Sequence, residues 1–378
     1  MRVLHIITGL SAGGAEQQLR QLLRHLPTEV ECDVVALTSP GAVADGLRAD
    51  GVRVRHLGMG GSRDLGALPR LTKLIRTGGY DVVHTHLYRA CLYGRIAARL
   101  AGVRAVVASE HSLLEDSVEG RRATRGVRAL YLLGERLGRV TVAVSPTVAG
   151  TLQRWGVPGS RIRVIPVGFD PDLFRFDEVR RKRARMHYGL PEDAFVVGAV
   201  GRQISGKRFD VLVQALPHLP AETRLLLVGD GPEHTALGRI AQELGVAGQV
   251  VMTGERPYLP DSRDGAPGIP DLMFAMDVLA GPSLVETYGM AAMEALATGL
   301  PVLYTTAPAL SGLPPGSVPS ALRVTGGAEE YARELLRLHA AGPGERTVPE
   351  VVRHNSIQNI ARQTSRLYTE VLSDSTRK

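Results

Sequence analysis

The sequence has few cysteines and no long apolar run. Its 378 residues include two cysteines, Cys32 and Cys91, and so small a number excludes a disulfide-rich secreted scaffold and favours a reducing cytoplasm. No apolar stretch approaches the ~20 residues that a membrane-spanning helix needs. The chain begins directly with an apolar, strand-like segment, so we expect no signal peptide. Together these absences predict a cytoplasmic protein.

Aromatic residues are also scarce, at 4% of the chain, whereas the formal net charge is +7. Basic side chains concentrate in two runs, residues 121–128 and 180–185. A nucleic-acid site needs aromatic side chains on which bases can stack, and these runs have almost none nearby, so we expect no nucleic-acid partner. Two interpretations of the runs remain: solvated helix faces, which we favour, and docking on an anionic membrane.

Short apolar segments alternate with amphipathic ones along the chain. Residues 2–7, 34–37, 103–108 and 225–229 are typical of buried strands. Their alternation with helical patterns predicts an α/β architecture with parallel sheets. A length of 378 residues suits two domains better than one.

The domain boundary is expected in a segment rich in proline and charge, between Gly168 and Asp193. This segment separates two sets of strand-helix units. The N-terminal domain then covers residues 1–172, and the C-terminal domain covers residues 173–355.

Two glutamates, Glu286 and Glu294, flank a short turn and the start of a helix late in the chain. Between them, Gly289 would let the backbone come close to a ligand, and the free N–H groups that open the helix suit a diphosphate. Both carboxylates can accept hydrogen bonds from hydroxyl groups. The segment therefore predicts a sugar-phosphate site, and the alternative is a solvated glutamate on an ordinary helix.

A second phosphate-binding signal lies upstream, in the segment 201–208, GRQISGKR, which follows an apolar run. It differs from a P-loop because Arg208 stands where the magnesium-binding hydroxyl should be, which disfavours a nucleotide hydrolase. What remains is a strand followed by two cations. Arg202 can grip phosphate oxygens in a bidentate manner, and Lys207 supplies a point charge.

These two motifs resemble G-R-x(4)-K and E-x(7)-E of the retaining glycosyltransferases of family four. Weaker matches follow in the family's order over nearly the whole chain, at residues 13–16, 81–86, 109–112, 145–146, 164–170 and 228–232. The resemblance implies the GT-B fold, in which two Rossmann-like domains have parallel sheets that face each other across a cleft. It also implies that the last helix, within residues 356–378, crosses back to the N-terminal domain.

The resemblance implies a reaction as well. Arg202 and Lys207 would stabilise the charge that builds on the departing diphosphate, while Glu286 would hold the donor sugar. His111 would contact the sugar and support the developing positive charge, with Glu110 as a rival base. The other residues expected to bind the donor are Gly13, Gly14, Arg256, Thr287, Tyr288, Gly289, Met290 and Glu294.

A metal site is the competing interpretation of a pair of histidines. His84 and His86 share one face of a predicted strand, so with His111 they would offer three metal ligands. No matching carboxylate-rich group accompanies them, and the family's chemistry needs no metal. We therefore expect no metal and no other cofactor, because the nucleotide sugar is a substrate.

The acceptor is predicted from the acids beside His111. Glu110, Glu115, Asp116 and Glu119 favour an acceptor that carries amines. The alternative is an exposed acidic loop balanced by the arginines at 121 and 122. The expected partners are thus a nucleotide sugar and a small polar acceptor. The residues expected to bind this acceptor are His86, Glu110, Glu115 and Asp116.

Residues 7–14, 64–70 and 84–90 resemble one branch of the family. That branch glycosylates the aminocyclitol 2-deoxystreptamine in aminoglycoside antibiotic pathways, usually with UDP-N-acetylglucosamine as donor. Two other functions stay open: an envelope or capsular glycosyltransferase that acts on a lipid-linked or glycan acceptor, and a non-catalytic nucleotide-sugar-binding protein. Residues 257–268 exceed the family pattern and predict a surface loop near the nucleobase.

Overall fold

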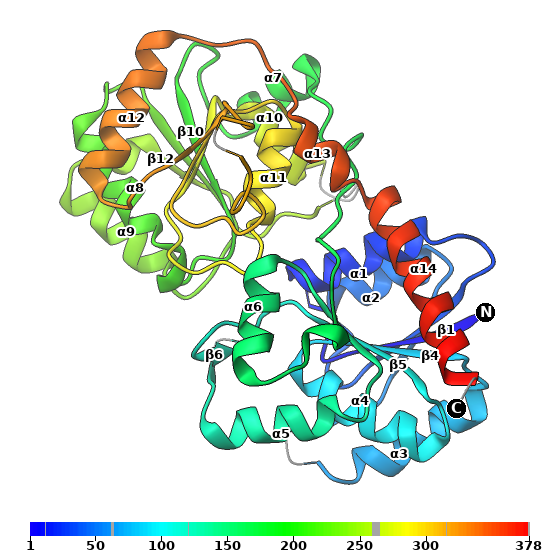
Figure 1. Ribbon diagram of the computed structural model, residues 1–378. Coiled ribbons are helices and arrows are strands. Elements are labelled where there is room, and N and C mark those ends of the chain that lie inside the picture. Colours follow the sequence, from blue (N-terminus) through cyan, green and yellow to red (C-terminus); the bar gives the residue numbers. More distant parts are fainter. Residues whose placement is uncertain (12, 62–63, 120, 259–264, 315, 377–378) are drawn as a thin grey trace. The chain divides into compact units, whose positions relative to one another are not determined.

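The computed structural model describes residues 1–11, 13–61, 64–119, 121–258, 265–314 and 316–376. The chain forms two compact units (Figure 1). Unit 1 consists of Met1–Phe169 and Asn355–Lys378, and unit 2 consists of Asp170–His354. The chain thus leaves unit 1 once and returns to it once, close to the positions 172 and 355 that the sequence suggested.

Unit 1 is built on a sheet of seven parallel strands in the order β3-β2-β1-β4-β5-β8-β9. Its central strands are apolar and buried, as expected where helices cover both faces of a parallel sheet. The strands are β1 (Arg2–Ile7), β2 (Glu31–Ala36), β3 (Arg53–His56), β4 (Val82–His86), β5 (Ala105–Glu110), β8 (Val140–Ala143) and β9 (Ile162–Val164).

Alternate residues of β1 show the two layers of helices. Leu4 and Ile6 pack in one cluster with α3 and α4, whereas Val3 packs in another cluster with α14. The α-helices of unit 1 are α1 (Gly14–His25), α2 (Gly41–Ala49), α3 (Ala67–Gly78), α4 (Tyr88–Ala101), α5 (Arg125–Glu135), α6 (Pro146–Trp155) and α14 (Ile357–Thr376), and β6 (Ser117–Val118) pairs with β7 (Arg121–Arg122).

Unit 2 repeats this plan with six parallel strands in the order β12-β11-β10-β13-β14-β15. Its strands are β10 (Val196–Val200), β11 (Arg224–Val228), β12 (Val250–Met252), β13 (Val278–Gly281), β14 (Val302–Tyr304) and β15 (Ala321–Arg323). Its α-helices are α7 (Glu178–His187), α8 (Phe209–Ala215), α9 (His234–Glu243), α10 (Ile269–Ala275), α11 (Met290–Ala297), α12 (Ala328–Ala341) and α13 (Glu350–His354).

Each sheet has one topological switch point. In unit 1 the chain builds outward from β1 to β3 and then crosses to β4 on the other side of β1, and in unit 2 it does the same from β10 to β13. Ligands of open α/β sheets bind at such points, outside the carboxyl ends of the strands. The fold therefore directs attention to the residues that follow β1, β4, β10 and β13.

The basic run 180–185 lies on α7 and differs from the solvated helix face that we expected. Arg181 and Arg185 both form ion pairs with Asp277, with N–O distances of 2.7 and 2.8 Å. Arg185 is buried and also donates to three backbone carbonyls near the start of β10. The prediction was wrong for these side chains because they fasten α7 to the body of unit 2.

Both cysteines are free thiols. Among the described helices, none combines the length and the hydrophobicity that crossing a membrane requires.

Candidate active site

The two phosphate-binding signals of the sequence meet in unit 2. Lys207 follows β10 and Glu286 follows β13, and these two strands are hydrogen-bonded neighbours at the switch point. The Lys207 ammonium donates to Oε1 of Glu286, and both side chains keep about a fifth of their surface exposed, at 24% and 19%. Arg202 lies exposed in the same loop as Lys207. The fold thus gathers three of the four predicted catalytic residues at one edge of one sheet.

The turn before α11 is the place where the sequence predicted a close approach of the backbone to a ligand. Gly289 adopts φ +94°, a left-handed conformation that favours glycine, and it precedes the first residue of α11. A Cβ at this position would lie 3.1 Å from Cα of Ala307, so the loop after β14 packs closely on the turn. The first N–H groups of α11, from Met290 onward, have no partner within the helix and can receive an anion.

Tyr288, by contrast, points into the protein. Its residue is 4% exposed, and its hydroxyl is buried without a hydrogen-bond partner in the described part of the chain. Burial raises the pKa of this phenol above its usual range. Any contribution of Tyr288 to donor binding is therefore expected from its backbone, and the role of Thr287 remains a prediction.

Glu294 has a partner that the sequence did not indicate. The hydroxyl of Tyr258 donates to Oε1 of Glu294 over 2.7 Å, and both residues are buried. Burial raises the pKa of Glu294 to about 7. Tyr258 also packs edge-on against Phe174, with ring centroids 5.7 Å apart. It belongs to the extra segment 257–268, whose residues 259–264 lie outside the described residues.

Arg256 stands farther along the sheet. It follows β12, two strands away from β10, and its Nε donates to the carbonyl of Glu255 over 2.9 Å. Its predicted role in donor binding remains a prediction.

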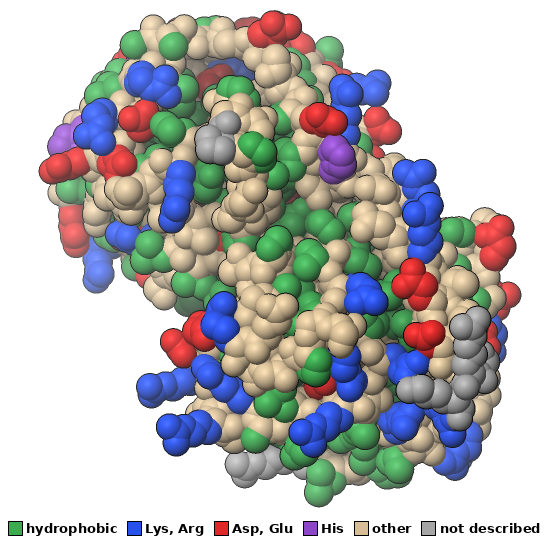
Figure 2. Space-filling model, in the orientation of Figure 1, with side chains coloured by type: hydrophobic (Ala, Val, Ile, Leu, Met, Phe, Trp, Pro, Cys, Tyr) green, Lys and Arg blue, Asp and Glu red, His purple; other side chains and the backbone are tan. Residues whose placement is uncertain are grey.

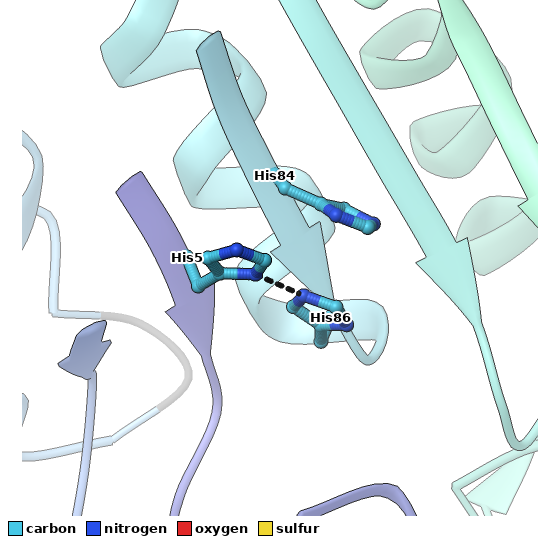
Figure 3. Close-up of side chains that lie close together, drawn as sticks. All are labelled: His5, His84 and His86. Atoms are coloured by element: carbon cyan, nitrogen blue, oxygen red, sulfur yellow. Dashed lines mark hydrogen bonds between the residues drawn. The ribbon is translucent and has the colours of Figure 1, made fainter. Parts of the chain in front are cut away.

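In unit 1, four histidines gather at the switch point. His5 on β1 and His84 on β4 are register partners, His86 ends β4, and His111 follows β5. His5 Nδ1 lies 3.0 Å from His86 Nε2 (Figure 3), and His86 Nδ1 lies 3.4 Å from His111 Nε2. His5 was not identified from the sequence. A polar residue between Val3 and Ile7, on the buried face of a predicted strand, could have indicated it.

A second set of hydrogen bonds holds His84. Its Nδ1 lies 2.6 Å from the hydroxyl of Tyr368 on α14, and its Nε2 lies 2.8 Å from Oγ of Ser109 on β5. The last helix thus returns to unit 1 and contacts the histidines directly, as its predicted crossing required.

Burial keeps these histidines neutral. It lowers the pKa of His5 to about 3 and that of His111 to about 4, and it lowers the pKa values of His84 and His86 well below their usual range.

Neutral imidazoles can bind metals, and nitrogens of His5, His84 and His86 lie within 4.8 Å of one another. However, hydrogen bonds already occupy both nitrogens of His84 and of His86. A metal ion would have to displace them, so the geometry suits a hydrogen-bonded network better than a metal centre.

Glu110 lies inside unit 1 and does not face the surface. Its residue is 1% exposed, and burial raises the pKa of the carboxyl group to about 6, opposed by the nearby guanidinium of Arg95 and by Tyr131. Arg95 is itself buried and donates to Thr141 over 2.9 Å. An enclosed carboxylate cannot reach an acceptor without rearrangement, so the structure favours a structural role over the predicted role as base or acceptor ligand.

The acidic loop after His111 is exposed, and its charges are paired. Glu115 accepts from Nε of Arg154 over 2.6 Å, and Asp116 lies 3.4 Å from Arg128. These two carboxylates therefore pair with arginines that lie farther along the sequence than those at 121 and 122. This pairing weakens the charge argument for an amine-bearing acceptor, although the predicted contacts themselves remain predictions.

Gly13 and Gly14 lie between β1 and α1, at the switch point of unit 1. Gly13 precedes α1, and Gly14 is its first residue. A Cβ on Gly13 would lie 2.3 Å from a carboxylate oxygen of Glu16, so the side chain of Glu16 folds over the helix start close to this glycine. Burial raises the pKa of Glu16 to about 7. The sequence did not single out this carboxyl group.

On the face shown in Figure 2, Lys and Arg side chains gather over β6 and α5. Helix α5 exposes Arg125 at its start, and Leu130 and Leu133 are 45% and 61% exposed. Helix α5 therefore carries charge from the first basic run and, just after that run, exposed apolar surface.

Known proteins match both units. The profile of Glycosyltransferase Family 4 matches residues 12–173, and the profile of Glycosyl transferases group 1 matches residues 194–341. The chain is 31% identical to the 2-deoxystreptamine glucosyltransferase of Streptomyces kanamyceticus, over 72% of this chain and 71% of that protein. It is 32% identical to D-inositol 3-phosphate glycosyltransferase 1 of Catenulispora acidiphila, over 70% of this chain and 66% of that protein.

Solved structures agree with these sequence matches. HepE of Anabaena in complex with UDP superimposes with a TM-score of 0.82 at 23% identity, over 98% of this chain and 100% of that chain. A sucrose-phosphate synthase from Thermosynechococcus elongatus superimposes with a TM-score of 0.76 at 22% identity, over 99% and 100%. The prediction of two Rossmann-like domains with the GT-B fold is confirmed, and the chain belongs to Glycosyltransferase Family 4.

Proposed function

We propose that this glycosyltransferase transfers N-acetylglucosamine from UDP-N-acetylglucosamine to 2-deoxystreptamine with retention of configuration. The observation that carries the proposal is the Lys207–Glu286 pair at the switch point of unit 2. In this pair, a cation that would bind the diphosphate lies beside a carboxylate that would bind sugar hydroxyls. The N–H groups at the start of α11 follow Glu286 closely in the chain.

The reaction needs stabilisation of a leaving group. The bond between the anomeric carbon and the β-phosphate oxygen breaks, and a bond from the acceptor hydroxyl oxygen to the anomeric carbon forms. The acceptor's proton passes to the departing phosphate oxygen. Lys207, Arg202 and the N–H groups of α11 face the charge that develops on the diphosphate, and such donors contribute a few kcal/mol each. We propose that no metal or other cofactor takes part.

The acceptor is inferred from the named activities of the relatives. One is named for 2-deoxystreptamine and the other for D-inositol 3-phosphate, and both compounds are six-membered carbocycles with ring hydroxyls. The neutral imidazole of His111 in unit 1 suits such a hydroxyl, because only one of its two nitrogens is hydrogen-bonded to another described residue. The amine-bearing cyclitol remains our choice because residues 7–14, 64–70 and 84–90 resemble the 2-deoxystreptamine branch.

The test is product formation followed by mass spectrometry. The purified protein is incubated with 2-deoxystreptamine or D-inositol 3-phosphate and with UDP-N-acetylglucosamine, UDP-glucose, and GDP- and dTDP-sugars. Lys207→Ala provides the inactive reference. A pseudodisaccharide from UDP-N-acetylglucosamine and 2-deoxystreptamine is expected, whereas product from UDP-glucose alone would replace the donor. Tight UDP binding without any product or hydrolysis would support a non-catalytic binder.

A second candidate, an envelope glycosyltransferase, is favoured by the surface of α5. Leu130 and Leu133 are exposed beside arginines, and such a combination suits an anionic membrane interface. Sedimentation with vesicles containing phosphatidylglycerol tests it, with phosphatidylcholine vesicles as the control. Binding that Leu130→Ser and Leu133→Ser together abolish would support this candidate, and lipid-linked acceptors would then be assayed.

A further inference from the structure

We propose that His5 and His86 are positioning residues that fix the tautomer of His111, so that His111 presents an N–H group from Nδ1. The proposal rests on the proposed function only where it assigns His111 a part in the reaction. Its structural content concerns three rings that come from three adjacent strands of unit 1 and form one hydrogen-bonded row.

The geometry of the row is continuous. His5 Nδ1 and His86 Nε2 are 3.0 Å apart, and their rings stack with an interplanar angle of 18°. His86 Nδ1 and His111 Nε2 are 3.4 Å apart, with ring centroids at 5.7 Å. His84 packs against His86 but belongs to a separate branch, since its nitrogens contact the hydroxyls of Tyr368 and Ser109.

Protons can be arranged along this row in two ways, because each neutral ring carries one proton. In the first arrangement, His5 Nδ1–H donates to His86, and His86 Nδ1–H donates to Nε2 of His111. In the second, every proton points the other way, and His5 must then carry its proton on Nε2.

The surroundings of His5 decide between the two. Its Nε2 is buried and has no hydrogen-bond partner in the described part of the chain. Buried N–H groups without a partner are rare, and unpaired acceptors are tolerated more often. The cavity of about 30 Å³ near the cluster is lined by His84, His86 and His111 but not by His5, so a water molecule there would not serve Nε2. The first arrangement is therefore favoured.

The consequence falls on His111. Its Nε2 accepts from His86, so its proton lies on Nδ1, which has no partner in the part of the chain that the structure describes. The residue itself is partly exposed. His111 can thus donate a hydrogen bond to a ligand oxygen and cannot take up the acceptor's proton while the row is intact. This excludes it as a general base and leaves proton acceptance to the departing phosphate.

The test is the ¹⁵N chemical-shift pattern of the His111 ring in the full-length protein at pH 7. The wild type is expected to show the Nδ1–H tautomer. His5→Phe keeps a ring but removes the first donor, so His111 is expected to become a mixture of tautomers. His5→Asn restores a donor near the Nδ1 position and should restore the wild-type pattern. Tyr368→Phe is the matched control, because it removes a hydroxyl from the other branch and should leave the tautomer unchanged.

Activity gives a second readout. The row would act on the reaction through one hydrogen bond from His111, so kcat should fall about two- to tenfold in His5→Phe, the value of one hydrogen bond, and recover in His5→Asn, with the donor KM little changed. A wild-type His111 protonated on Nε2 would overturn the proposal, as would a tautomer that His5→Phe leaves unaltered or that responds to EDTA. If no nucleotide sugar supports turnover, the proposed function fails, but the ¹⁵N chemical shifts still test the tautomer of His111.

Discussion

The two switch points of this molecule occupy equivalent places in two similar sheets, yet their chemistry is opposite. Beside β1 and β4, burial holds four histidines neutral in a network of uncharged hydrogen bonds. Beside β10 and β13, a lysine and a glutamate form an ion pair at a partly exposed position. Fold position alone therefore does not set the chemistry of a site. The charged site suits a departing diphosphate, and the neutral site suits hydroxyl groups that must be oriented without added charge.

The largest effect is expected when the positive charge of Lys207 is removed from the site of unit 2. Lys207→Ala should lower kcat by about 10²- to 10³-fold, the effect typical of losing one donor to a developing anion. Single-turnover assays with a radiolabelled donor measure it. Lys182→Ala is the matched control, because Lys182 also pairs with a glutamate of unit 2, Glu192 at 2.9 Å, but belongs to α7. Equal losses in the two variants would remove Lys207 from the mechanism.

The next largest effect is expected inside unit 1. Glu110→Gln should lower the free energy of unfolding by about 1 to 3 kcal/mol, because the buried guanidinium of Arg95 loses the nearby carboxylate while it stays out of water. Urea denaturation measures the loss, and Glu115→Gln on the exposed loop serves as the control. A variant with unchanged stability but a much higher acceptor KM would instead restore the predicted role of Glu110 as an acceptor ligand.

Features that depend on residues close together in the chain could be predicted from the sequence, whereas contacts between residues far apart in the chain could not. Short apolar runs in the sequence indicate parallel strands. The motifs that contain Lys207 and Glu286 each follow such a strand, and the two strands are neighbours in the sheet. Partnerships between side chains do not have this local signal. His5 meets His86, Tyr258 meets Glu294, and Arg185 meets Asp277 only after the sheets form. The arginines on α7 and the carboxylates near His111 were therefore predicted with the wrong surroundings.

A smaller effect is expected from the pair that the sequence missed in unit 2. If a ribose hydroxyl of a nucleotide binds Oε1 of Glu294, the hydroxyl of Tyr258 competes with it for that oxygen. Tyr258→Phe should therefore tighten UDP binding about three- to tenfold, the net value of one hydrogen bond to an ionisable group. Calorimetry measures it. The control is Tyr331→Phe, which removes another buried tyrosine hydroxyl of unit 2, bonded to Thr305 over 3.1 Å. Weaker UDP binding by Tyr258→Phe would make Tyr258 a ligand of the nucleotide.

The histidines of unit 1 and Glu294 of unit 2 should also respond to pH in opposite directions. The pKa values of His5 and His111 fall from 6.5 to about 3 and about 4, so their stability is present above pH 6.5 and is lost as the pH falls. The pKa of Glu294 rises from 4.5 to about 7, so its stability is present below pH 4.5 and is lost as the pH rises through 7. Each group changes the unfolding free energy by at most about 1.4 kcal/mol per pH unit.

Melting temperatures between pH 7.5 and 5 separate these contributions. Because Glu294 offsets part of the loss from the histidines as the pH falls, Glu294→Gln should make the decline steeper, while His5→Phe should make it shallower. Parallel curves for the wild type and both variants would show that neither group titrates differently in the folded and unfolded states.

The smallest effect is expected at Glu115, and it decides whether the acidic loop belongs to the site. Its carboxylate is exposed and already paired with Arg154, and exposed pairs contribute little to stability. Glu115→Ala should therefore change the melting temperature by no more than about 1 °C and the KM for 2-deoxystreptamine by less than about threefold. Asp172→Ala, which removes a comparable exposed partner of Arg175, is the control. A tenfold rise in KM in Glu115→Ala alone would mean that an acceptor amine displaces Arg154 from Glu115. The site of unit 1 would then also use a charged side chain, and the contrast with unit 2 would be weaker.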